Sequence, residues 1–151
     1  MEDRVRRSLE GGTTVLVASV SPHGVPSCCR GIAVSSDDHL ATLRVYVPIA
    51  VSQDTIANIA TTRRVAVSVT HPLDHASVQL KGTTRTARLA DASEASFVAS
   101  RLDQMSDVLD SIGIPRHITR TMTYWPAYAI ELDVEEIYEQ TPGPNAGSRL
   151  R

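Results

Sequence analysis

The chain has 151 residues and a mass of 16.3 kDa, which is the size of one ordinary domain. Its hydrophobic fraction of 42% and charged fraction of 21% are typical of a water-soluble globular protein, so we expect no membrane-embedded segment. The net charge of −2 excludes a strong electrostatic attraction to nucleic acid or to an anionic membrane surface. Because only 4% of the residues are aromatic, we expect an aliphatic core and no aromatic platform for stacking bases.

The first third of the chain is predicted to contain a short helix followed by three strands. The helix covers residues 2–9 and is closed by two glycines. β-Branched residues predict a strand over 13–20, and a Ser-Pro-His-Gly turn leads from it into a second extended run over 26–34. Polar residues then turn the chain back into a strand over 40–47. Turns of this length predict an antiparallel meander.

The middle of the chain changes period and then returns to strand character. Apolar residues recur at helical spacing within 52–62, which predicts a short helix. A strand is predicted over 65–70, and one long or kinked strand over 76–89. Gly82 lies inside that long strand, where an isolated glycine is typical of a β-bulge.

The last third is predicted to contain a longer helix and a final strand. The Asp-Ala-Ser-Glu sequence at 91–94 has capping-box spacing and opens the helix, which a glycine and a proline end at 113–115. A short third helix is predicted over 116–123. Strict alternation predicts a half-exposed strand over 128–138, followed by an irregular tail over 140–151.

These elements predict a mainly β fold in a single domain over 1–151, with its core in 13–139. No strand–helix–strand alternation is present, which disfavours a parallel sheet. Two arrangements fit: an all-β barrel with two to three added helices, or an α+β fold.

The cysteines and histidines give no sign of a disulfide or a metal site. Cys28 and Cys29 are adjacent, so on a strand their thiols point to opposite faces. They are expected to be small core residues rather than nucleophiles, although Arg30 beside them could lower a thiol pKa. Pro72 disfavours a helical metal pair between His71 and His75. The charged N-terminal residues lack the apolar stretch of a secretory signal, so we expect a reducing cytoplasm.

The most informative stretch is 45–67, in which a strand leads through a loop into a helix. The first turn carries hydroxyl and amide side chains, and a helix N-terminus offers free backbone N–H groups that suit a phosphate. Arg30, on a neighbouring strand, could supply the cation. The alternatives are that Ser52 and Thr55 merely cap the helix, and that Arg30 faces solvent.

The order of these passages resembles that of the flavin-binding split barrels related to pyridoxamine 5′-phosphate oxidase. The resemblance covers 13–89 and 125–147. It depends on four passages that are individually weak and more specific in this order: VLVASVSPHGVPSCCRG, SQDTIANIATTRRVAVSV, VQLKGTTRTARL and IYEQTPGPNAG.

The resemblance implies a six-stranded antiparallel split β-barrel that forms a homodimer, with FMN in a cleft between the subunits. It implies that Arg30 contacts the phosphate and that 47–49 lines the flavin ring through backbone atoms. Lys81 and Trp125 would lie at the ring edge or belong to the second subunit's site. The implied cofactor-binding residues are Arg30, Val47, Pro48, Ile49, Ser52, Gln53, Thr55, Asn58, Lys81 and Trp125.

Two departures from the oxidase argue against true pyridoxamine phosphate oxidase activity. The oxidase has an Arg-Lys pair at the helix start where this chain has Gln53-Asp54-Thr55, and its C-terminal histidine and arginine motif has no counterpart here. We therefore expect an FMN-dependent oxidoreductase acting on an unknown small molecule, with no catalytic residue identified. The alternatives are a cofactor-free binding or sensing module, and the same fold with deazaflavin F420 or haem.

Overall fold

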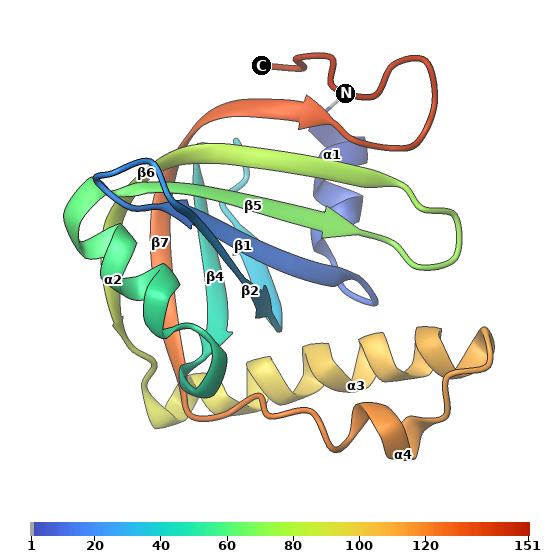
Figure 1. Cartoon of the computed structure of the whole chain (residues 1–151). Coiled ribbons are helices and arrows are strands. Elements are labelled where there is room, and N and C mark those ends of the chain that lie inside the picture. The colour runs from blue at the N-terminus through green and yellow to red at the C-terminus, as the bar shows by residue number, and fades with distance from the viewer. Residues whose placement is uncertain (1) are drawn as a thin grey trace.

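A computed structural model describes residues 2–151 as one curled sheet with attached helices (Figure 1). The strands are β1 (Thr14–Val20), β2 (Pro26–Gly31), β3 (Ala33–Ser36), β4 (Thr42–Pro48), β5 (Arg64–Thr70), β6 (Ser77–Leu89) and β7 (Ala127–Glu139). The helices are α1 (Glu2–Leu9), α2 (Gln53–Thr62), α3 (Ala95–Ser111) and α4 (Arg116–Thr119), with 3₁₀ turns η1 (Ile49–Val51) and η2 (Ala92–Glu94). None of the described helices is both long and apolar enough to cross a bilayer.

The strands pair antiparallel in the order β2-β1-β5-β6-β7-β4-β3. The two end strands, β2 and β3, are separated in sequence by Ile32 alone. Since one residue spans only about 3.4 Å, the sheet must curl until its ends meet. The predicted mainly β split-barrel class is confirmed. Seven strands replace the predicted six because the second extended run divides at Ile32, whose N–H donates to Tyr46 at 2.9 Å.

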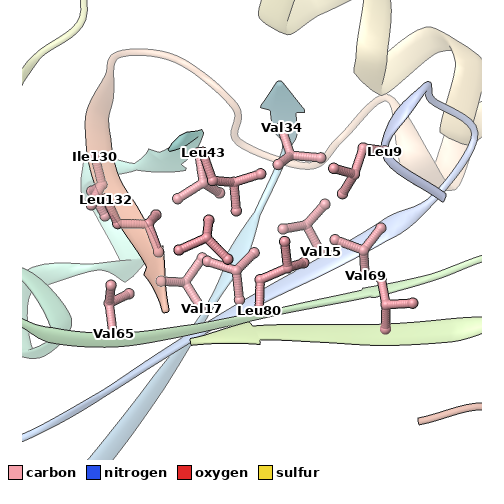
Figure 2. Close-up of a cluster of buried hydrophobic side chains, with 14 of the residues drawn as sticks. Leu9, Val15, Val17, Val34, Leu43, Val65, Val69, Leu80, Ile130 and Leu132 are labelled. Carbon is pink, nitrogen blue, oxygen red and sulfur yellow. The ribbon is translucent and has the colours of Figure 1, made fainter. Parts of the chain in front are cut away.

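The barrel interior is aliphatic, as the composition predicts. Alternate residues of β1 and β5 point inward, and among them Val17, Val67 and Val69 are fully buried. Figure 2 shows Val17 and Val69 in one cluster with Leu43, Leu80, Ile130 and Leu132 from the other strands. Helices α1 and α2 each add residues to this cluster, while α3 packs a second cluster onto the outside of β3, β4 and β7.

Helix α3 is fixed at its start by the predicted capping box, which is confirmed between Asp91 and Glu94. The Glu94 carboxylate also accepts hydrogen bonds from Arg88 and from the Tyr46 hydroxyl. These contacts, led by that from the Arg88 guanidinium, lower the pKa of Glu94 to about 2. The predicted tail lacks regular structure, but Arg151 donates to the carbonyls of Leu40 and Val134 and ties it to the barrel.

The predicted bulge at Gly82 is confirmed by a register shift between Lys81 and Gly82 in the β6–β7 ladder. A Cβ atom at position 82 would overlap the carbonyl oxygen of Asp133, a backbone atom that cannot shift without distorting β7.

Gly82→Ala is therefore expected to lower the free energy of unfolding by roughly 2–3 kcal/mol, measured by urea denaturation. Ala87→Val, which adds volume at an exposed position of β6, is the control. Equal stability of the two variants would contradict the steric role of Gly82.

Candidate functional site

The start of helix α2 follows directly on β4 and the turn η1. Ser52 is the residue before the helix, and its carbonyl accepts the first helical hydrogen bond, from Ile56. Its hydroxyl makes no capping bond, so the capping interpretation is wrong for Ser52: the backbone there (φ −114°, ψ 9°) is not in the extended conformation that caps favour. Instead the side chain is fully buried, and its Oγ has no hydrogen-bond partner within residues 2–151.

The next inward-facing residues of α2 join a cluster of polar side chains. Thr55 Oγ1 lies 3.3 Å from Ser27 Oγ, and the Asn58 amide donates to Ser19 and Ser27 at 3.2 and 3.1 Å. The Ser19 and Ser27 hydroxyls lie 2.9 Å apart on paired residues of β1 and β2. The side chains of Thr55 and Asn58 thus attach α2 to the barrel.

The two cysteines face opposite sides of β2, as predicted. Cys29 is buried in the core cluster, and burial raises the pKa of its thiol despite a hydrogen bond with Thr55. Cys28 is exposed on the outer face. A raised pKa keeps Cys29 in the neutral thiol form, which favours its interpretation as a small core residue.

Arg30 lies on the outer face of β2, opposite Leu16 of β1. Its Nη2 donates to the carbonyl of Thr123 at 2.9 Å, while its buried Nη1 has no hydrogen-bond partner among the described residues. Burial lowers the pKa of this guanidinium. The same segment before β7 also meets the turn before α2, because the Ile49 N–H donates to Pro126 at 3.0 Å. Arg30 and the start of α2 therefore flank one stretch of chain.

The residues predicted to line the flavin ring lie at the end of β4 and the start of η1, next to the segment before β7. Val47 and Pro48 are buried and pair with Tyr128 and Ala127 of β7, and Ile49 begins η1 half-buried. On its other side β4 pairs with β3, and it also contacts β2, with which it forms no ladder. We call this unpaired contact between β2 and β4 the seam.

Four predicted site residues lie apart from this seam or point away from it. Gln53 and Asp54 are exposed in the first turn of α2. Lys81 lies on β6, which is three strand positions from β2 in the sheet. Strand spacing alone therefore separates it from Arg30 by roughly 14 Å. Its Nζ lies 4.6 Å from the centre of the Tyr138 ring, in a groove of about 280 Å³ floored by small residues. Trp125 packs into the second cluster, against α3.

Three residues near the seam were missed by sequence reasoning: Ser19, Ser27 and Thr123. The first two could have been found, because the predicted β1–β2 hairpin pairs them and alternation turns both inward. Thr123 acts through its carbonyl, so its side chain gives no signal. Among the described residues no group of three or more His, Cys, Asp or Glu is placed to hold a metal ion.

Comparison with solved structures identifies the fold. No protein-family model matches the sequence, and no curated protein matches it. Among solved structures, HupZ of Group A Streptococcus aligns over 96% of this chain and 98% of its own, with 16% identity and a TM-score of 0.58. A putative pyridoxamine 5′-phosphate oxidase of Lactobacillus delbrueckii aligns over 91% and 92%, with 16% identity and a TM-score of 0.56.

The chain has the split-barrel fold. An F420 reductase shares it too, with 17% identity, a TM-score of 0.55, and coverage of 87% of this chain and 94% of the reductase. The resemblance seen in the sequence is thus confirmed for the fold. The neighbours carry differently described activities, so the fold does not by itself select a cofactor.

The buried hydroxyl of Ser52 predicts an unusual effect of substitution. A buried polar group without a partner costs free energy, so Ser52→Ala is expected to raise the free energy of unfolding by about 1 kcal/mol in the protein without ligand. Urea denaturation measures this, with the exposed Ser96→Ala as the control. A clear loss of stability in Ser52→Ala would show that the hydroxyl has a partner in the folded chain.

Proposed function

We propose that this split barrel binds FMN at the seam between β2 and β4 and works as a flavin-dependent oxidoreductase on a small molecule. The observation that carries the proposal is the fully buried Ser52 hydroxyl, which has no partner among the described residues and lies at the N-terminus of α2. A phosphate accepts hydrogen bonds from such a hydroxyl and from the free N–H groups of a first helical turn.

Arg30 fits the same phosphate end. Its buried Nη1 is a charged donor without a partner in residues 2–151, and a charge-assisted bond to phosphate would satisfy it. The Thr123 carbonyl holds the other nitrogen and so fixes the guanidinium. Asp54, exposed in the first turn, is the one charge that opposes an anion there.

The end of β4, with Val47, Pro48 and Ile49, is the surface proposed for the flavin ring. When bound, FMN supplies the exchange of a hydride or electrons, and the protein supplies position and electrostatics. The β4 backbone would contact the flavin ring, and the Arg30 side chain would contact the phosphate. The free thiols of Cys28 and Cys29 suit a reducing setting, for which we propose the cytoplasm.

The protein as purified should be yellow and show a flavin absorption spectrum, and the released cofactor should be FMN by chromatography. A released deazaflavin would show that the barrel uses F420, and a Soret band would show haem. A colourless protein that also fails to bind added FMN would refute cofactor binding and favour a binding or sensing module.

The phosphate placement predicts that Arg30→Ala and Ser52→Ala weaken FMN binding by roughly ten- to a hundred-fold, because each removes a bond to a charged group. Titration followed by quenching of flavin fluorescence measures the dissociation constants. Arg85→Ala, which removes an arginine paired with Asp133, is the matched control. Unchanged affinity in both seam variants would mean that the phosphate lies elsewhere.

The homodimer is proposed to form through the outer face of β1 and β5. Leu16 is 52% exposed there, and its neighbours Ala18, Ala66 and Ser68 are small enough to let a second copy approach closely. We expect a dimer at micromolar concentration by sedimentation velocity, and Leu16→Glu should dissociate it. Leu89→Glu, at an exposed leucine outside this face, should not. A monomeric wild type would contradict the proposal.

A further inference from the structure

Helix α2 is attached to the barrel in two different ways. One side carries Ile59, which is buried in the aliphatic core, and Ile56, which packs against it. The same inward face also carries Thr55 and Asn58, whose side chains bond to Ser27 on β2 and Ser19 on β1. Apolar contacts tolerate small shifts of a helix, whereas hydrogen bonds of fixed length and direction do not.

The polar contacts form a closed cluster, which we call the α2 clasp: Ser19, Ser27, Thr55 and Asn58. Every member is bonded to at least one other member, at 2.9–3.3 Å. All four side chains are neutral, so the geometry of the clasp is insensitive to salt and to pH near neutrality. Ser19 and Thr55 are buried and Ser27 and Asn58 are half-buried, which limits the access of water to these bonds.

The clasp joins the two elements that bear the proposed phosphate donors. Ser27 lies three residues before Arg30 on β2, and Thr55 lies three residues after Ser52, one helical turn into α2. The bond between Ser27 and Thr55 therefore sets the separation of the Arg30 strand from the Ser52 turn. No clasp side chain has to touch the ligand for this to matter.

We infer that the α2 clasp positions the phosphate site, so that Thr55 and Asn58 act as positioning residues and not as phosphate ligands. This inference depends on the proposed binding of FMN at the seam. Loosening the clasp should move the first turn of α2 relative to Arg30. Misplacement of this kind penalises the contacts to phosphate, which need both partners, far more than contacts of the ring with β4.

The test compares FMN with riboflavin, which has the same ring without the phosphate. Thr55→Val keeps the side-chain shape and removes the hydroxyl, while Thr55→Ser keeps the hydroxyl. Thr61→Val makes the same change as Thr55→Val on the exposed side of the same helix, where the hydroxyl bonds to the Ala57 carbonyl of its own helix. Ser27→Ala removes the clasp partner on β2 and serves if Thr55→Val does not fold.

We expect Thr55→Val and Ser27→Ala to weaken FMN binding about ten-fold and riboflavin binding less than two-fold. Thr55→Ser and Thr61→Val should bind FMN as the wild type does. Thermal unfolding of each variant without ligand shows whether weaker FMN binding comes from a less stable fold or from a displaced helix α2.

Three results would overturn the inference while leaving the proposed function intact. The first is wild-type affinity for FMN in both Thr55→Val and Ser27→Ala. The second is an equal loss of FMN affinity and riboflavin affinity in these two variants. The third is a loss of FMN affinity in Thr61→Val as large as that in Thr55→Val. The last two would reveal a general role of α2 in stability. A wild-type protein that binds neither flavin would instead refute the proposed function, and the positioning role with it.

Discussion

The whole arrangement depends on a single covalent constraint, the junction at Ile32. Because β2 pairs with one end of the sheet and β3 with the other, one residue between them forces the sheet to close. The hydrogen-bonded closure is incomplete, because β2 contacts β4 without sharing a ladder with it. Helix α2 packs chiefly against β1 and also against β2, and the turn η1 connects its N-terminus to the end of β4.

The seam differs chemically from the rest of the core. Elsewhere valines and leucines fill the barrel, and their packing requires shape but little direction. At the seam, hydroxyl and amide groups hold α2 through directional bonds, and Ser52 and Arg30 retain buried donor atoms without partners among the described residues. Unpaired buried polar atoms cost stability, and this cost is the basis on which we propose a ligand there.

The sequence predicted most of the fold because its signals are local. Gly82 predicted the bulge, since only a residue without Cβ fits against the backbone of β7, and Asp91 and Glu94 predicted the start of α3. The break at Ile32 could not be predicted, because an extended backbone continues through it and only its pairing partners change. Strand pairing is a property of the closed sheet, not of that segment.

The sequence indicated which residues belong to the candidate site but not how their side chains are arranged. The sequence singled out residues around the start of α2, yet hydroxyl and amide groups bind a neighbouring strand as readily as a phosphate. Which they do depends on the inward direction of Ser19 and Ser27. The separation of Lys81 from Arg30 likewise follows from strand order, which the chain order of the predicted strands did not show.

The central claim is that the seam recognises a phosphate-bearing flavin. Parallel titrations of the wild-type protein with FMN and riboflavin test it most directly. The account predicts that FMN binds at least about ten-fold more tightly, which corresponds to about 1.4 kcal/mol from the contacts to phosphate. Equal affinity for the two flavins, or binding of neither, would contradict it.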